Sequence, residues 1–295
     1  MAYLISVFKR KKTLALCFTC LGIFSCFLLF LMTAPCIRKI TFEKPPEHTL
    51  CVLVPFRDAF EELLEFIPHM NEFLNRQKIK FYFVVVNHAE DGNRFNKGSV
   101  FNAGFEFISK QYPDCNYIAL HDIDLLPLND EIPYQYPGDD VYNVANPDYH
   151  PRGEKYDPER YVGGILLISI EQYIRVNGLG NNFWGWGGED RNFYYRLSNN
   201  SIARIRPENL STDRSNTFKN IHSPNRSRDF TRKCSSGVKK QKKDNIEYDF
   251  QSGLHDVKYE LQSVHSFRMD QVPFTLYSIS VPCDYSKTPW CKSTC

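Results

Sequence analysis

The 295-residue chain lacks a large excess of charge of either sign, because 36 lysine and arginine residues stand against 34 aspartate and glutamate residues. A net charge of +2 is too small to be the electrostatic footprint of a nucleic-acid-binding protein, so we expect no nucleic acid among its partners. The hydrophobic share of 42% is ordinary for a globular chain, and the length suits one large domain or two small ones.

The glycine-rich phosphate loops of common nucleotide-binding folds are also missing. The chain contains neither a GxGxxG fingerprint nor a Walker sequence, so phosphates, if bound, must be held by a metal ion and side chains. Beyond residue 36 there is no zinc-type CxxC pair. These absences exclude the usual dinucleotide folds and a structural zinc site of that kind.

Charged side chains are absent from residues 13 to 36, and four basic residues directly precede this stretch. Its length is enough to cross a bilayer, whereas the apolar part of a cleaved signal peptide, the alternative, is usually only about 7 to 15 residues long. The preceding basic residues favour a cytoplasmic N-terminus. We therefore expect a cytoplasmic tail at 1–12, a transmembrane signal-anchor at 13–36, a stem at 37–48 and a lumenal domain at 49–295.

Six of the ten cysteines lie beyond residue 36, and an even number suits disulfide pairing in an oxidising lumen. The stretch CDYSKTPWC indicates that Cys283 or Cys291 is bridged, although the pairing cannot be read from the sequence. Three Asn-x-Ser acceptor sequences for N-glycosylation, at Asn199, Asn209 and Asn225, suit the same compartment.

Apolar runs and helical patterns alternate through the first half of this lumenal domain. The pattern predicts strands at 51–56, 79–88 and 117–124 and helices at 60–74 and 99–110. We expect Asp58 to cap the first helix and Pro68 to kink it. This order of elements predicts an α/β domain with a largely parallel sheet.

A further strand is expected at 161–169, opening on Gly163 and Gly164, which permit a ligand or a second backbone segment to approach closely. The polar and basic segment from 219 to 243 has no periodic apolar face. We interpret it either as a solvated loop or as a lid that closes over a ligand.

Asp122 and Asp124 end the third expected strand, in the run CNYIALHDIDLLPL. Alternate residues of a strand point the same way, so two like charges would lie side by side and need a cation or basic neighbours. Ligands of parallel sheets bind at the carboxyl ends of the strands, and carboxylates are good ligands for a hard divalent cation. The alternative is a turn in which both carboxylates cap backbone amides.

Two tryptophans and two acids share the glycine-rich stretch FWGWGGED. Aromatic rings commonly hold sugars by stacking, and we expect this role for Trp186, with Trp184 in the core. Glu189 and Asp190 stand at the expected start of a helix, where acids are favourable in any case. We nevertheless favour a chemical role for Asp190.

Six motifs together resemble the β-1,4-galactosyltransferase family, from about Cys51 to Cys291: VPFRDAFEELLEFIPHMNEFL, RFNKGSVFNAGF, YIALHDIDLLPLN, YVGGILL, FWGWGGED and TFKNIHSP. The stretches RPENLST and TPWC resemble the branch that acts on xylosylated proteins. The resemblance implies one GT-A-like nucleotide-diphospho-sugar transferase domain behind a type II anchor in the Golgi membrane. It further implies inverting, Mn²⁺-dependent transfer of galactose from UDP-galactose to the 4-hydroxyl of xylose on proteoglycan core proteins.

The same resemblance assigns roles to individual residues. It makes Asp190 the catalytic base and Asp124 and His222 manganese ligands, with Asn220 where the family has a second ligating histidine. The implied donor-binding residues are Pro55, Phe56, Arg57, Phe95, Asn96, Lys97, Asp122, Tyr156, Gly164 and Trp186. The implied acceptor-binding residues are Trp186, Gly188, Glu189 and Asp190.

Three departures from the family pattern concern the acceptor and the metal. Asn220 replaces a histidine, Gly188 replaces an arginine, and the acceptor segment around Tyr156 is longer and altered. Two alternatives therefore stay open: an enzyme that acts on N-acetylglucosamine acceptors, and a Golgi sugar-binding protein without catalysis.

Overall fold

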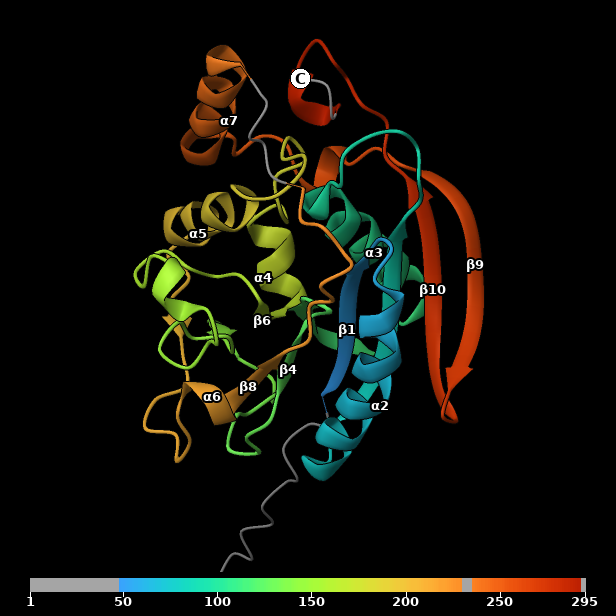
Figure 1. Cartoon of the computed structure of the whole chain (residues 1–295), viewed down its shortest axis with the longest axis vertical. Coiled ribbons are helices and arrows are strands. Elements are labelled where there is room, and N and C mark those ends of the chain that lie inside the picture. Colours follow the sequence, from blue (N-terminus) through green and yellow to red (C-terminus); the bar gives the residue numbers. More distant parts are fainter. Residues whose placement is uncertain (1–47, 230–234, 293–295) are drawn as a thin grey trace, which may run out of the picture. The chain divides into compact units, whose positions relative to one another are not determined.

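The structure is a computed structural model that describes residues 48–229 and 235–292 (Figure 1). The expected tail and anchor, and all but the last residue of the stem, lie outside these ranges. Within the described ranges no helix is both long and apolar enough to cross a membrane.

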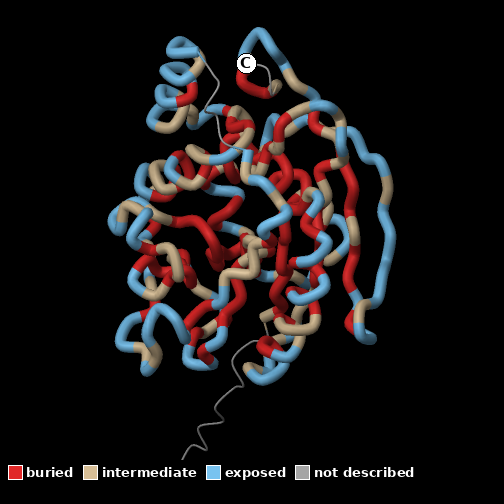
Figure 2. Tube along the Cα trace, in the orientation of Figure 1, coloured by how far each residue is buried: buried red, intermediate tan, exposed pale blue. Residues whose placement is uncertain are grey.

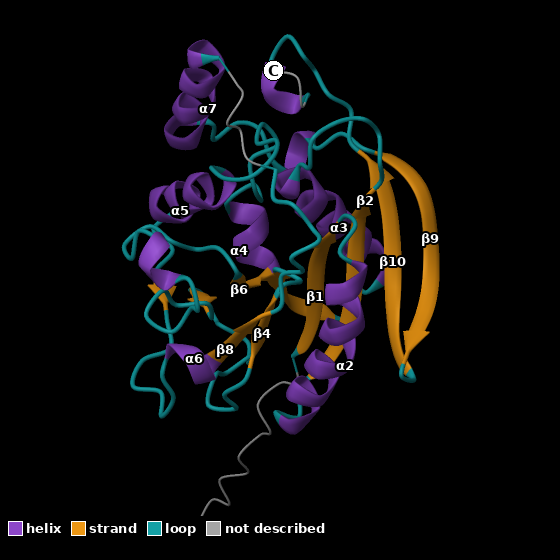
Figure 3. Cartoon of the chain, in the orientation of Figure 1, coloured by secondary structure: helices purple, strands orange, loops and turns teal. Residues whose placement is uncertain are grey.

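An eight-stranded sheet forms the centre of the domain, in the order β7-β5-β6-β3-β1-β2-β10-β9, and β4 pairs with β8 in a second, two-stranded sheet (Figures 1 and 3). The strands are β1 (Thr49–Phe56), β2 (Lys80–His88), β3 (Cys115–His121), β4 (Leu125–Pro127), β5 (Val141–Asn143), β6 (Ile165–Ser169), β7 (Arg204–Ile205), β8 (Phe218–Asn220), β9 (Glu260–Met269) and β10 (Val272–Ser280). The α-helices are α2 (Phe60–Arg76), α3 (Lys97–Gln111), α4 (Ile170–Arg175), α5 (Glu189–Asn199), α6 (Arg214–Thr217) and α7 (Ser236–Tyr248).

The sheet is mixed rather than largely parallel. Strands β3, β1 and β2 are parallel to one another, as the alternation of strands and helices predicts, and β10 is parallel to β2. Beyond them, β9 and β6 run antiparallel to their neighbours. The β9–β10 connection is a tight turn in which Asp270 and Gln271 both have positive φ, and such a turn can only join antiparallel strands.

Both faces of the central strands are buried, because alternate side chains enter two different cores. In β1, Leu50, Val52 and Val54 belong to the cluster that includes α2, while Cys51 and Leu53 belong to the cluster that includes α3, α4 and α5. A strand with helices on both faces reads as a continuous apolar run, which is why CVLVPF has no polar alternation. Figure 2 shows this buried centre and the exposed outer strand β9.

Two expected strand boundaries are wrong, one at the end of β3 and one at the start of β6. β3 ends at His121, so Asp122 and Asp124 lie in the turn that leads to β4 and not on a strand. β6 begins at Ile165 and not at residue 161, since Gly164 has a φ of +77°, outside the extended range of a strand.

The expected cap of helix α2 is also wrong. Asp58 does not cap α2: it has a φ of +53°, the N-cap position is Ala59, and no side chain caps this helix. An N-cap residue normally adopts an extended conformation, which a positive φ excludes. The next long helix, α3, is capped as the rule requires, because Asn96 accepts a hydrogen bond from the Ser99 amide at 2.9 Å.

The basic segment 219–243 is not a solvated loop throughout, because its last eight residues begin α7. Ser235 caps the start of α7, and Asn192 of α5 donates to the carbonyls of Asn245, Ile246 and Asp249 at its end. Only Lys242 of this helix is buried. Polar tertiary contacts therefore supplement the packing of Val238 against the core, and Val238 and Ile246 are too few for a hydrophobic period to show in the sequence.

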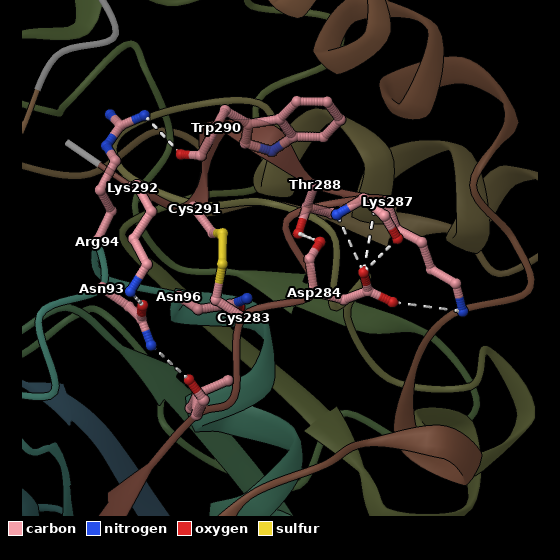
Figure 4. Close-up of a disulfide and its surroundings, with 12 residues drawn as sticks. Asn93, Arg94, Asn96, Cys283, Asp284, Lys287, Thr288, Trp290, Cys291 and Lys292 are labelled. Carbon is pink, nitrogen blue, oxygen red and sulfur yellow. Dashed lines mark hydrogen bonds and ion pairs between the residues drawn. A yellow bond between two sulfur atoms is a disulfide. The ribbon is translucent and has the colours of Figure 1, made fainter. Parts of the chain in front are cut away.

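Two disulfides are present in the described part of the chain. Cys51–Cys115 joins the neighbouring strands β1 and β3, and Cys283–Cys291 closes the loop that follows β10. Figure 4 shows this second disulfide beside Arg94, whose guanidinium donates to the Trp290 carbonyl at 3.1 Å. The pairing within CDYSKTPWC is thus between its own two cysteines.

Candidate active site

A cavity of about 820 Å³ lies among the segments that follow the carboxyl ends of β1, β2 and β3. This is the edge where the sequence predicts the ligand. The predicted site residues that line it are Pro55, Arg57, Phe95, Lys97, Asp122, Asp124, Tyr156, Trp186, Gly188, Glu189, Asp190 and His222.

Four predicted site residues lie outside the lining and support it instead. Phe56 is in the core with its ring against Phe60, and Asn96 is the cap of α3. Gly164 accepts a hydrogen bond from the Asp122 amide at 2.7 Å, which fixes the acidic turn. Asn220 pairs with Leu125 across the β4–β8 ladder.

Lys97, the first residue of α3, connects three carboxylates of the cavity. Its ammonium lies 2.8 Å from Asp122, 3.5 Å from Asp190 and 4.0 Å from Glu189. Burial lowers the pKa of Lys97, but the three carboxylates outweigh burial and hold the pKa well above its usual value. Lys97 is therefore a permanent cation that neutralises part of an acidic site.

Asp190 occupies the first turn of α5, directly against Gly163. A Cβ atom on Gly163 would lie only 2.3 Å from Oδ2 of Asp190, so the Gly-Gly of YVGGILL makes room for this carboxylate. Burial, together with Glu189 and Asp122, raises the pKa of Asp190 to about 7, while Lys97 opposes the rise. A carboxylate with a pKa near neutrality is suited to general-base chemistry.

Asp124 and His222, from separate segments of the chain, meet on the cavity wall. His222 Nδ1 lies 2.9 Å from Asp124 Oδ2, and Arg228 and Arg226 approach the same oxygen at 3.1 and 3.5 Å. Burial raises the pKa of Asp124, but its contact with His222 and the two guanidinium groups lower the pKa to about 2. Asp124 is thus ionised under all ordinary conditions.

These two side chains fit a divalent metal such as manganese. Nε2 of His222 faces the Arg226 carbonyl at 2.9 Å, and Nδ1 faces a guanidinium N–H of Arg226, so in the neutral ring the proton is on Nε2. The lone pair of Nδ1 then faces a carboxylate oxygen of Asp124, an arrangement that a shared cation satisfies. Among the described residues no group of three or more His, Cys, Asp or Glu could hold a metal, so the chain supplies a partial ligand set.

The segment from His222 to Asp229 is tied down at both ends. Buried Glu62 accepts from the Ser223 amide at 3.1 Å and from Arg226 Nε at 2.7 Å. At the other end, Arg94 makes two hydrogen bonds of 2.8 and 2.9 Å to the Asp229 carboxylate. We use the name metal-side loop for residues 222–229.

Sequence reasoning missed Arg226, Arg228 and Arg94, although each lines the cavity. A signal was present for Arg94, because it begins the motif RFNKGSVFNAGF. Arg226 and Arg228 belong to the basic segment, where charge alone does not separate a site from a solvated loop.

Arg57 lines the cavity, but its guanidinium donates its hydrogen bonds to backbone carbonyls. It donates to the carbonyls of His88, Ala89 and Asn93 at 2.8 to 3.0 Å, and its guanidinium lies 5.7 Å from the centre of the Phe95 ring. Arg57 therefore shapes the loop after β2 and presents Phe95 to the cavity.

The mixed sheet, with a cavity beside its parallel strands that is lined by a metal-compatible pair and by the Asp190 carboxylate, is that of a glycosyltransferase with a GT-A-like fold. Residues 42–137 match the N-terminal region of glycosyl transferase group 7, and residues 147–223 match the N-terminal domain of galactosyltransferase. The chain belongs to the β-1,4-galactosyltransferase family.

Relatives and solved structures agree with this assignment. The chain is 43% identical to β-1,4-galactosyltransferase 7 of Drosophila melanogaster, over 83% of this chain and 73% of that protein. It is 41% identical to xylosylprotein 4-β-galactosyltransferase of Caenorhabditis elegans, over 83% of each chain.

The crystal structure of the Drosophila catalytic domain in complex with xylobiose superposes with a TM-score of 0.75, at 43% identity, over 83% of this chain and 99% of that one. A mutant of the same enzyme, in complex with manganese, UDP-Gal and xylobiose, gives a TM-score of 0.76 at the same identity and coverage.

Proposed function

We propose that this chain transfers galactose from UDP-galactose to the 4-hydroxyl of a xylose on proteoglycan core proteins, with inversion at the anomeric carbon and with manganese. The observation that carries the proposal is the juxtaposition, in one cavity, of the Asp124–His222 pair and of Asp190 with its pKa raised to about 7. The similarity to enzymes named for xylosylprotein, and to a structure that holds manganese, UDP-Gal and xylobiose, supports the choice of substrates.

The chemistry of the chain's own residues follows from their positions. Asp190 accepts the proton of the acceptor hydroxyl as its oxygen attacks the anomeric carbon, and direct displacement by that oxygen turns an α-linked donor into a β-linked product. Lys97 holds Asp190 and Asp122 at fixed distances and balances their charge. A divalent metal, when bound at Asp124 and His222, supplies stabilisation of the charge on the leaving diphosphate.

Two further features of the cavity suit a sugar. Trp186 lines the cavity and is 48% exposed, and an indole ring is an apolar surface on which sugars commonly stack. Oε2 of buried Glu189 meets no hydrogen-bond partner among the described residues, although a buried carboxylate oxygen normally has one. A sugar hydroxyl donated to this oxygen would satisfy it.

We also propose that the protein is a single-pass type II membrane protein of the Golgi, with the catalytic domain in the lumen. The uncharged stretch of residues 13 to 36 behind a basic tail supports this topology. In cells that express the chain with a C-terminal tag, the tag is expected to resist added protease until the membranes are dissolved, and to colocalise with a Golgi marker. Cleavage of the tag in intact vesicles would place the domain on the cytoplasmic side and contradict the proposed orientation.

The activity is tested with the purified domain, UDP-galactose and manganese, offered β-xylosides and N-acetylglucosaminides in parallel. We expect transfer to xylosides, with a β-1,4-linked product by NMR. A preference for N-acetylglucosaminides would replace the acceptor in the proposal. UDP-galactose binding without transfer to any acceptor would instead identify a sugar-binding protein.

A further inference from the structure

Trp186 lies on a glycine-rich loop whose backbone needs contacts with other segments to keep one conformation. Gly185, Gly187 and Gly188 have φ angles of +68°, +92° and +110°, and glycine loses more conformational freedom on ordering than any other residue. The loop is therefore fixed from outside, at several backbone groups. The Gly185 amide donates to the Phe95 carbonyl at 2.7 Å, and the Trp186 amide donates to the Asp229 carbonyl at 2.8 Å.

The carbonyls of the same loop face a buried ammonium. Lys242 Nζ lies 3.2 Å from the carbonyl oxygens of both Trp184 and Trp186, and the residue is only 8% exposed. A buried lysine without an adjacent carboxylate is costly, and charge-assisted hydrogen bonds to carbonyls are what offset that cost. Lys242 is thus placed to hold the backbone on both sides of Gly185.

Helix α7, which carries Lys242, is itself bound to α5, the helix that carries Asp190. Asn192 of α5 binds three carbonyls at the end of α7, and Arg196 of α5 donates to the Asp249 carbonyl at 2.8 Å. Ile246 of α7 lines the cavity beside Gly188. Helix α7 therefore connects the base-bearing helix to the tryptophan loop.

We propose that Lys242 is a positioning residue for the sugar acceptor: it fixes the loop that presents the Trp186 ring to the cavity, without touching the substrate. The inference rests on the proposed function and, of the donor and acceptor roles that the resemblance implies for Trp186, takes the acceptor role. The nucleotide side of the cavity is built by other segments, the loop after β2 and the metal-side loop. Loss of Lys242 should therefore change acceptor binding far more than donor binding.

The test compares Lys242→Met, which keeps the length of the side chain but removes its donors, with Lys243→Met. Lys243 is the exposed neighbour on the same helix, so its variant removes the same charge without a loop contact. We expect the acceptor KM of Lys242→Met to rise roughly tenfold or more, with UDP–manganese affinity unchanged, and no change in Lys243→Met. An unchanged KM, or a parallel loss of acceptor and UDP affinity, would overturn the proposal.

A pH series adds a readout that a merely structural lysine would not give. Burial lowers the pKa of Lys242 to about 8, with Arg94 lowering it further and Glu189 and Asp229 opposing. The ammonium is lost as pH rises through this value, so the acceptor KM of the wild-type enzyme should increase above pH 8. The KM of Lys242→Met should lack that increase; an alkaline rise of equal size in both would contradict the role.

Tryptophan fluorescence separates this inference from the proposed activity, because it needs no transfer. Lys242→Met is expected to raise quenching by acrylamide relative to Lys243→Met, and adding Trp186→Phe should abolish the difference. If wild-type protein transferred no sugar and the quenching change were still seen, the proposed function would fail while the loop contact held. Equal quenching in both lysine variants would show that Lys242 does not fix the tryptophan loop.

Discussion

At the residue scale, the properties of the site depend on neighbours from distant parts of the chain. Asp190 and Asp124 are both partly buried aspartates of one cavity, yet the pKa of the first is raised to about 7 and that of the second is lowered to about 2. The difference arises because Asp190 faces two other carboxylates and one lysine, whereas Asp124 contacts a histidine and two arginines. One side chain can therefore take a proton near neutral pH while the other stays an anion.

The first prediction concerns the pH dependence of turnover. A base with a raised pKa must be ionised to act, so kcat at saturating acceptor should rise with pH through about 7 and level off above it. Asp190→Asn should lower turnover by roughly 10²- to 10⁴-fold and remove this limb, while UDP–manganese binding stays nearly unchanged. Rate profiles from pH 5 to pH 9 check both statements. Near-normal turnover in a well-folded Asp190→Asn protein would refute the assignment of the base.

The second prediction uses the glycine beneath the base. Gly163→Ala places a methyl group 2.3 Å from Asp190 Oδ2, so the carboxylate has to move. Misplacement of a catalytic group by about 1 Å costs on the order of a hundredfold, and kcat should fall by roughly ten- to a hundredfold with little change in UDP affinity. Gly237→Ala is the control, since nothing lies within 4 Å of a Cβ there. Equal rates in the two variants would show that Asp190 adapts freely.

At the scale of elements, the ends of paired strands bring the site residues together, and contacts from a helix end fix the loop that carries His222. The ladder between β4 and β8 places Asp124 and His222 at neighbouring ends, and the Ile221 amide donates to the Asp124 carbonyl at 2.9 Å. The first turn of α2 then fixes the metal-side loop through Glu62. Neither contact is local in sequence.

The third prediction tests the hold of α2 on the metal-side loop. Glu62→Gln removes the negative charge that pairs with Arg226 in a buried position, so His222 should lose its fixed place beside Asp124. We expect manganese-dependent UDP binding to weaken by roughly tenfold, measured by calorimetry with and without manganese. Glu72→Gln, an exposed change on the same helix, is the control and should bind as the wild type does. Identical affinities in the two variants would contradict the link.

At the scale of the whole molecule, two disulfides constrain the chain over very different lengths. Cys51–Cys115 spans 64 residues and joins two central strands, whereas Cys283–Cys291 spans 8 residues at the end of the domain. The short loop holds Arg94 through the Trp290 and Cys291 carbonyls, and thereby supports the nucleotide side of the cavity.

The fourth prediction compares removal of each disulfide by paired Cys→Ala changes. Chain-entropy arguments give a loss of about 4 kcal/mol for Cys51–Cys115 and about 2.5 kcal/mol for Cys283–Cys291, measured by denaturant unfolding. Donor affinity should show the opposite order, with the larger loss for the Cys283–Cys291 variant. A larger stability loss for the short loop would count against the entropic account.

Local patterns in the sequence predicted much of this fold because they express local physics. The apolar runs of β1 and β2 and the helical periods of α2 and α3 reflect burial on fixed faces, and the described elements begin within two residues of those expectations. The edges of the sheet, the start of β6 and helix α7 could not be predicted in this way. They are set by a hairpin turn, by a positive φ at Gly164 and by polar contacts with α5, none of which leaves an apolar period.

The sequence by itself determined which chemical groups the site has: the motifs HDIDLLPLN, FWGWGGED and NIHSP supply the acids, the tryptophan and the histidine. The tertiary structure alone decided what those groups are able to do. It showed that Asn220 lies outside the cavity lining, that Arg226 and Arg228 accompany His222, and that a lysine of α7 holds the tryptophan loop. The reason is physical: a motif fixes the type of a side chain, but pKa, burial and contact depend on groups from distant parts of the chain, and only the folded chain brings them together.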